Sequence, residues 1–170
     1  PVDILINNAG LIDPISRIEE ADPLQSGQVV DVNVTGAFHM LRAVVPGMSK
    51  KGSGLVINIS SGAATSALKD GRILRDESGI LSLTRTAYKE LASKRVNVVG
   101  RSQGTVATDM QRVIKSSGIN PVSQLDWDAH IPAEWAAIAI AWFTTADARS
   151  CAGGDFSLKN DEGHRAVGLP

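Results

Sequence analysis

The sequence predicts an α/β fold in which a parallel sheet lies between two layers of helices. Four short segments rich in Val, Ile and Leu are apolar almost throughout, as expected of strands that are buried on both faces. Segments with helical spacing of apolar residues separate them, and neither an internal repeat nor a low-complexity tract interrupts this order. A three-layer unit built on a small parallel sheet accounts for the pattern.

The predicted strands and helices alternate along the chain. The strands are Val2–Ile6, Leu55–Ile59, Val96–Val99 and Gly153–Leu158. The helical patterns run from Val29 to Val45, from Ile80 to Leu91, over a short stretch that begins at Thr108, and from Pro132 to Phe143. We expect Pro46 and Gly47 to end or kink the first of these helices, and the segment Pro121–His130 to be a loop.

Composition limits the classes of function. The 170 residues carry 17 basic and 18 acidic side chains, a net charge of −1, with 43% hydrophobic and 21% charged residues. These values are typical of one folded domain, residues 1–170, and they argue against a disordered chain and against a nucleic-acid binder of the basic-patch kind. The longest apolar run, Trp135–Phe143, is far shorter than the roughly 20 residues that a bilayer requires, so we expect no membrane partner.

Cysteine and histidine usage argues against disulfides and zinc. Cys151 is the only cysteine, which excludes an intramolecular disulfide and suits a reducing compartment, so we expect a cytoplasmic protein. His39, His130 and His164 lack the spacing of a cluster of metal ligands. We therefore expect no metal site.

Polar and glycine residues follow each of the first three predicted strands. They form the segments Asn7–Gly10, Ser60–Gly62 and Gly100–Thr108. An open parallel sheet binds its ligand outside the carboxyl ends of its strands. These three segments are therefore the candidate binding site.

Five segments together resemble the short-chain dehydrogenase/reductase family, in the family's order and with near-family spacing. They are VDILINNAG (Val2–Gly10), DVNVTGAFHMLRAVVPGM (Asp31–Met48), GLVINISSGAA (Gly54–Ala64), SGILSLTRTAYKELASKRVNVV (Ser78–Val99) and GTVATDM (Gly104–Met110). The resemblance implies a Rossmann-like sheet, NAD or NADP as cofactor, and a small alcohol or carbonyl compound as substrate. It also implies an incomplete fold, because the chain opens at what resembles the family's fourth strand and contains no G-x-x-x-G-x-G segment for the cofactor's diphosphate.

The resemblance implies five cofactor contacts. Asn7, Ala9 and Gly10 would lie against the adenosine part of the cofactor, where small residues let a planar ligand approach the backbone and the Asn side chain ties strand ends together. Gly104 and Thr108 would lie against the nicotinamide part. Two structural alternatives remain open: the first group forms a plain turn, and Thr108 is an ordinary helix N-cap.

Two further residues match catalytic positions of the family. Asn33 matches the helix asparagine that helps to hold a water molecule in the proton relay, although a buried amide inside a helix also has structural uses. Ser61 matches the serine that hydrogen-bonds the substrate oxygen. The structural alternative is a strand-end serine that makes a turn bond, as Ser60 beside it could also do.

The sequence departs from the family at the residues that carry its chemistry. The family's tyrosine and the lysine four residues after it align with Leu74 and Ser78, and the only tyrosine, Tyr88, is followed at that spacing by Ala92. Leucine has no proton to exchange and serine has no charge, so we expect the family's proton donor to be absent. The loop after Val99 also lacks the family's proline and is about two residues longer, so its backbone has more conformational freedom to lose on ordering.

Two functions from different classes remain open, beside the third possibility of an incomplete product without a stable fold. The first is an NAD(P)-dependent oxidoreductase in truncated and diverged form, which would bind its cofactor weakly as this chain alone. The second is a non-catalytic scaffold or oligomerisation partner. Val2–Ile6 would present an open apolar edge, and the helices Gly36–Met48 and Gly79–Lys94 resemble the pair that joins subunits in the family, so we expect a homo-oligomer.

Overall fold

The computed structural model describes residues 2–60 and 75–170, with side chains from residue 78 onward in the second range. Two positions singled out by the sequence, Ser61 and Leu74, lie outside the described residues. Among the described residues, no helix combines the length and the apolar character of a membrane span.

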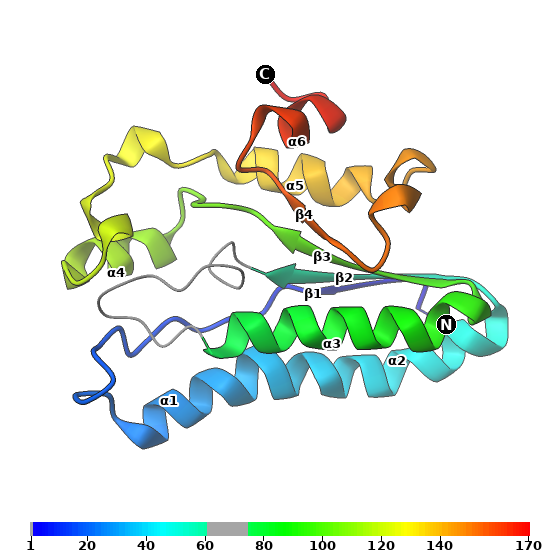
Figure 1. Cartoon of the computed structure of the whole chain (residues 1–170), viewed down its shortest axis with the longest axis horizontal. Coiled ribbons are helices and arrows are strands. Elements are labelled where there is room, and N and C mark those ends of the chain that lie inside the picture. Colours follow the sequence, from blue (N-terminus) through cyan, green and yellow to red (C-terminus); the bar gives the residue numbers. More distant parts are fainter. Residues whose placement is uncertain (1, 61–74) are drawn as a thin grey trace.

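Four parallel strands form one sheet in the order β1-β2-β3-β4 (Figure 1). They are β1 (Ile4–Asn7), β2 (Gly54–Ser60), β3 (Val96–Ser102) and β4 (Asp155–Ser157). The predicted parallel α/β sheet and its four strands are confirmed, with shifts at the strand ends. Helices connect each neighbouring pair, because parallel strands need a crossover.

Helices cover both faces of this sheet (Figure 1). One layer holds α1 (Pro23–Val30), the π-helical segment η1 (Asp31–Gly36), α2 (Ala37–Lys51) and α3 (Arg75–Leu91), which the short turn η3 (Ala92–Lys94) extends. The opposite layer holds α5 (Ala133–Trp142) and α6 (Asp161–Ala166). The remaining helix, α4 (Asp109–Ser117), lies beyond the carboxyl ends of the strands.

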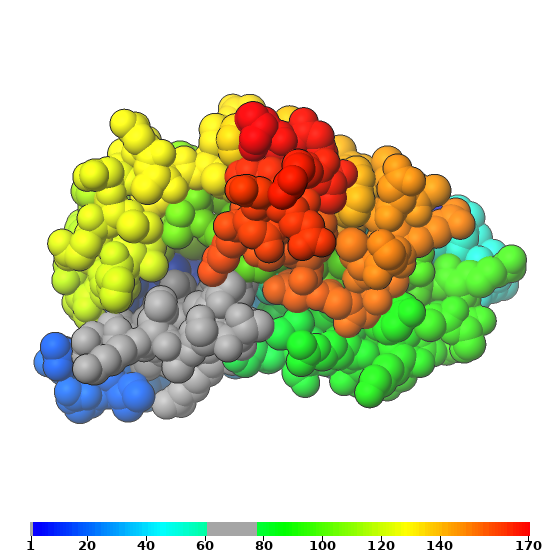
Figure 2. Space-filling view, turned by 45° about the horizontal axis from the view of Figure 1, so that its top comes forward, coloured from blue at the N-terminus to red at the C-terminus, as the bar shows by residue number. Residues whose placement is uncertain are grey.

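Each face of the sheet has its own apolar core. The buried side chains under α2 and α3 are Leu5, Leu41, Met48, Val56, Ala87, Leu91, Val96 and Val98. Those on the other face are Ile57, Val99, Phe143 and Ala148, continued under α6 by Ala139, Leu158, Val167 and Leu169. Successive residues of β2 and β3 serve opposite cores, which explains their continuous apolar runs. In the space-filling view, the red C-terminal segment packs onto the orange and yellow segments that precede it (Figure 2).

Pro46 and Gly47, which we expected to end or kink the first helix, do not end it. The single predicted helix is instead α1, η1 and α2 in succession, and α2 ends only at Gly52, whose φ of 73° lies in the left-handed region. Pro46 is exposed, so the backbone hydrogen bond that it removes lies on the solvent side. Leu41 and Met48 are buried against the sheet, and this packing carries the helix past the proline.

The prediction of a plain loop at Pro121–His130 needs a correction. Two 3₁₀ turns, Pro121–Gln124 and Trp127–Ala129, occupy most of it. Asn120 starts the first turn, since its Oδ1 accepts a hydrogen bond of 3.1 Å from the backbone N–H of Ser123. Such local side-chain bonds form short turns without any apolar periodicity, which is why the helical pattern did not reveal them.

The segment after Val99, which we expected to be loop from Gly100 onward, begins as strand. β3 continues through Gly100 and Arg101 to Ser102, and these buried residues pair with β2 on one side and with β4 on the other. The extra residues therefore lengthen a strand, because hydrogen bonds on both sides order their backbone.

Within the described residues, β1 pairs on one side only, with β2. Ile4 and Ile6 are 42% and 44% exposed, whereas Leu5 between them is buried under α2. The two exposed side chains at this edge of the described sheet are thus apolar. Such an edge is a template for pairing with another strand.

Candidate functional site

A pocket of about 590 Å³ lies at the carboxyl ends of the strands. Its walls come from the segment after β1, from η1 and the start of α2, from the end of β2, and from the loop and helix that follow β3. Six of the seven residues to which the sequence resemblance gives a role line this pocket: Asn7, Ala9, Gly10, Asn33, Gly104 and Thr108. The seventh, Ser61, lies outside the described residues. The fold thus gathers candidates from distant parts of the chain around one space.

Asn7 lines the pocket and at the same time ties two strands together. Its Nδ2 donates a hydrogen bond of 2.8 Å to Oδ1 of Asn58, which is fully buried on β2. Nδ2 of Asn58 donates in turn to Oγ1 of Thr84 on α3 at 2.9 Å, and that hydroxyl donates to the carbonyl of Ile80 at 2.8 Å. The expected role of asparagine at the strand ends is thereby seen directly. These bonds give the pocket a rigid floor.

Asn33 holds the loop that forms one wall. It lies in η1, and its amide makes a two-point contact with Leu11: Nδ2 donates to the Leu11 carbonyl at 2.9 Å, and Oδ1 accepts from the Leu11 N–H at 2.7 Å. A π-helical turn inside a longer helix is uncommon and is frequently found at functional sites. The two bonds support the structural use of Asn33 and place Ala9 and Gly10 at the pocket rim.

The wall after β3 depends on one glycine. Gly104 has a φ of 72°, a left-handed conformation that residues with a Cβ adopt at a cost, and it turns the chain out of the strand. The loop is then held by two backbone bonds to Ile131, at 2.9 Å each. Thr108 occupies the N-cap position of α4, but its side chain makes no capping bond and its Oγ1 donates to the Val106 carbonyl at 3.3 Å.

Ser60 and Asp155 form a contact that the sequence interpretation missed. Ser60, at the end of β2, lines the pocket, and its Oγ donates a hydrogen bond of 2.6 Å to Oδ1 of Asp155 on β4. Burial raises the pKa of Asp155, although the Ser60 bond and the charges of Arg85 and Lys159 oppose this rise. The only sequence signal was a lone carboxylate in the otherwise uncharged strand Asp155–Ser157.

Arg101 is a second buried ionisable group near the pocket. It is fully buried on β3, and its Nη1 donates to Oε1 of Gln103, a pocket residue, at 2.7 Å. Its Nε and Nη2 have no hydrogen-bond partner in the described parts of the chain. Desolvation lowers the pKa of Arg101 to about 10. The guanidinium therefore orients Gln103 at some cost in stability.

No tyrosine or lysine lines the described part of the pocket. Tyr88, the single tyrosine, packs on the core under α3 and lies against Gly153. Asp31 and His39 are the only titratable side chains among the described pocket residues, and both are exposed. In residues 2–60 and 75–170, no group of three or more His, Cys, Asp or Glu side chains is arranged so that it could hold a metal ion.

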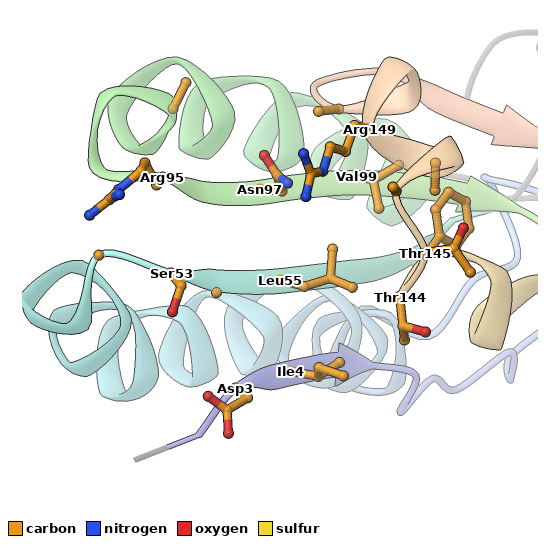
Figure 3. Close-up of a pocket in the computed structure, with 17 residues that line it drawn as sticks. Asp3, Ile4, Ser53, Leu55, Arg95, Asn97, Val99, Thr144, Thr145 and Arg149 are labelled. Atoms are coloured by element: carbon orange, nitrogen blue, oxygen red, sulfur yellow. The ribbon is translucent and has the colours of Figure 1, made fainter.

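A second hollow, of about 660 Å³, lies at the opposite ends of the strands. Figure 3 shows Leu55 of β2 and Val99 of β3 among the residues that line it, with Arg149, Thr144 and Thr145 from the segments after α5 beside them. None of the residues with a sequence-assigned role lines it. Because ligands of open parallel sheets bind at the carboxyl ends, the candidate site is the first pocket.

The chain is similar to several oxidoreductases. It is 31% identical over 166 residues to the acetoacetyl-CoA reductase of Cupriavidus necator, a match that covers 92% of this chain and 64% of that protein. It is 36% identical over 110 residues to the D-beta-hydroxybutyrate dehydrogenase of Rhizobium meliloti, covering 64% of this chain and 42% of the relative. The chain thus spans less than two thirds of the length of either relative.

Solved structures share the fold. An NAD⁺-bound xylitol dehydrogenase superimposes with a TM-score of 0.78 at 21% identity, over 92% of this chain and 67% of the other. A 4-hydroxyisoleucine dehydrogenase complexed with NADH gives 0.75 at 22% identity, over 92% and 66%. The family model described as short chain dehydrogenase matches residues 1–118, well over half of the chain. The chain therefore belongs to the short-chain dehydrogenase/reductase family.

Proposed function

We propose that this chain is part of an oxidoreductase that interconverts an alcohol and a carbonyl group with NAD or NADP. The observation that carries the proposal is the pocket at the carboxyl ends of β1–β3, which is lined by six residues that match positions of the family's site in the sequence. Two of the solved structures that share the fold are a dehydrogenase complexed with NADH and an NAD⁺-bound dehydrogenase. Those structures support the cofactor class, and the pocket supports its location.

The residues present fit part of such a cofactor. Ala9 and Gly10 are exposed at the rim, and a Cβ at position 10 would meet only Asn33 Oδ1 at 3.7 Å, so a planar group can approach the backbone there. Gly104 and Thr108 line the pocket from the segment after β3. A bound nicotinamide would supply hydride transfer, while these walls orient it. The diphosphate has no glycine-rich turn in this sequence, so binding by the chain alone is weak.

A second candidate, a non-catalytic oligomerisation partner, rests on two observations. In the sequence, Leu74 and Ser78 align with the family's tyrosine and lysine, and neither residue type lines the described part of the pocket. The surface of α1 and α2 also exposes large apolar side chains, with Leu24 at 81% and Phe38 at 50%. Exposed apolar patches of this kind mark association surfaces. We therefore propose that the chain forms a homo-oligomer, whether it is an oxidoreductase or a non-catalytic partner.

Titration calorimetry of the chain with NAD⁺, NADH, NADP⁺ and NADPH tests the first candidate. We expect dissociation constants of roughly millimolar magnitude for one of the two pairs. Gly10→Leu should weaken binding by filling the rim, whereas Gly27→Leu, at a position with open space around it, should not. A micromolar constant would contradict the weakness argued from the missing diphosphate turn. Complete absence of binding, together with a dimer in light scattering that Phe38→Glu dissociates, would favour the second candidate.

A further inference from the structure

We propose that Ser60 and Asp155 act as a proton-accepting pair for a substrate hydroxyl, so that the pocket is built to oxidise an alcohol. The inference rests on the proposed function, because it needs a nicotinamide cofactor to take the hydride. It concerns residues to which the sequence resemblance gives no role. Ser60 would be the catalytic residue in contact with substrate, and Asp155 the group that finally holds the proton.

The hydrogen bond between the two side chains fixes which way Ser60 can act. The Ser60 hydroxyl has one hydrogen, and it points to Asp155 Oδ1 at 2.6 Å. Only the lone pairs of Oγ remain for a ligand in the pocket that Ser60 lines. Ser60 is 6% exposed, so a ligand that reaches it is shielded from water. This oxygen can accept a hydrogen bond from the hydroxyl of an alcohol. It cannot donate one to a carbonyl without breaking its hydrogen bond to Asp155.

A glycine makes this contact possible across an intervening strand. Asp155 on β4 pairs with Gly100 on β3, and β3 separates it from Ser60 on β2. A Cβ at position 100 would stand 2.9 Å from Asp155 Oδ1 and 3.3 Å from the Gly154 carbonyl. Because Gly100 has no side chain, the space beside its Cα is open, and the Asp155 carboxylate reaches Ser60 through it. The same feature explains a glycine in the middle of a buried strand.

The surroundings of Asp155 suit a proton acceptor. Burial raises its pKa, which makes the carboxylate a better base than a free aspartate. The groups that oppose the rise are Ser60, Arg85 on α3 and Lys159 after β4. These three interactions favour the ionised carboxylate. The carboxylate is the form that can accept a proton, and with Ser60 oriented as a hydrogen-bond acceptor towards the pocket the pair suits the oxidation of an alcohol.

The proposed step is a two-electron oxidation of the substrate alcohol. The C–H bond at the carbinol carbon breaks, and its electron pair leaves as hydride to the oxidised nicotinamide cofactor. The substrate O–H proton passes to Ser60 Oγ while the Ser60 proton passes to Asp155, and the C–O bond becomes a carbonyl. A secondary alcohol and NAD⁺ or NADP⁺ thus give a ketone, the reduced cofactor and a protonated Asp155. Water returns the proton to solvent when the product leaves.

Carboxyl NMR titration of the whole chain tests the pair without turnover. With Asp155 assigned by comparison with Asp155→Asn, we expect Ser60→Ala to raise the Asp155 titration midpoint, because the hydroxyl bond favours the carboxylate. Ser102→Ala is the matched control, since Ser102 is as buried as Ser60, lies beside it on β3, and makes no side-chain hydrogen bond. It should leave the midpoint unchanged. An equal midpoint in Ser60→Ala and the parent would overturn the pairing.

Turnover measurements test the relay itself. With the chain saturated in NAD⁺ or NADP⁺ and a panel of short secondary alcohols, Ser60→Ala and Asp155→Asn should each lower the oxidation rate by about 10²-fold or more, while Ser102→Ala keeps it. The parent rate should rise with pH through the Asp155 midpoint, and Asp155→Asn should lose that rise. Bound nucleotide without turnover, or turnover that Asp155→Asn does not change, would overturn the relay alone. Absence of nucleotide binding in calorimetry would instead defeat the proposed function, and the relay with it.

Discussion

The side-chain amide of Asn7 donates a 2.8 Å hydrogen bond to Asn58, joining the carboxyl ends of β1 and β2 beneath the pocket. Asn58 is fully buried and passes the connection on to Thr84 of α3 at 2.9 Å. A strand end, its neighbour and a covering helix are thus held by consecutive side-chain bonds. Buried polar groups that are fully paired in this way rigidify a site, and one that loses its partner is costly.

Thr84→Val should destabilise the chain by about 1–3 kcal/mol, because Asn58 Nδ2 then lies buried without an acceptor while the side-chain volume hardly changes. Thr86→Val is the matched control, since Thr86 is exposed on the same helix. The free energy of unfolding in urea measures both. Equal stability of the two variants would show that the Asn58 amide finds another partner.

Arg101→Met should leave the chain at least as stable as the parent. Desolvation alone lowers the pKa of Arg101 to about 10, which shows that burial penalises the charged form. Replacing a buried charge by an apolar side chain of similar size is often neutral or stabilising by about 1–4 kcal/mol. Arg101→Ala, which leaves a cavity, should be clearly less stable in the same urea titration. A marked loss of stability in Arg101→Met would mean that the hydrogen bond to Gln103 stabilises the fold by more than the burial of the charge destabilises it.

Asp155→Asn should stabilise the chain at neutral pH and not in acid. Since the folded pKa of Asp155 lies above its ordinary value of 3.8, the folded state binds the proton more tightly, and stability falls as pH rises through the window just above 3.8. Asparagine carries no charge, and its Oδ1 still accepts from Ser60. Thermal unfolding at acid and neutral pH measures the effect, with Asp128→Asn on an exposed side chain as control. A gain of equal size at both pH values would refute a raised pKa.

Gly153→Ala should cost more stability than Gly168→Ala. Both glycines have positive φ, 76° and 75°, so each alanine incurs about 1–2 kcal/mol for the left-handed conformation. A Cβ at position 153 would also clash with Cδ1 of Tyr88, whereas a Cβ at position 168 would have no atom within 4 Å. Tyr88→Leu should relieve the additional loss at position 153, as a double-mutant cycle in denaturant can show. Additive effects would place the Tyr88 ring elsewhere in solution.

The sequence by itself determined the parallel sheet. Leu55–Ile59 and Val96–Val99 are apolar at every or nearly every position, which is a property of strands covered on both faces, and their order with intervening helices leaves few arrangements. It also located the pocket, because the residues that follow parallel strands must meet at one edge of the sheet. Short stretches of sequence are enough to predict the sheet and the place of the pocket, because each pattern lies within a few consecutive residues.

Only the tertiary structure decided the features that depend on distant partners. Pro46 stays inside α2 because Leu41 and Met48 pack on the sheet, and Gly100–Ser102 form strand because β2 and β4 flank them. Ser60 and Asp155 are 95 positions apart, and their bond exists because the strand order sets a glycine between them. Hydrogen bonds and burial of this kind are properties of the assembled sheet, and no window of the sequence contains both partners.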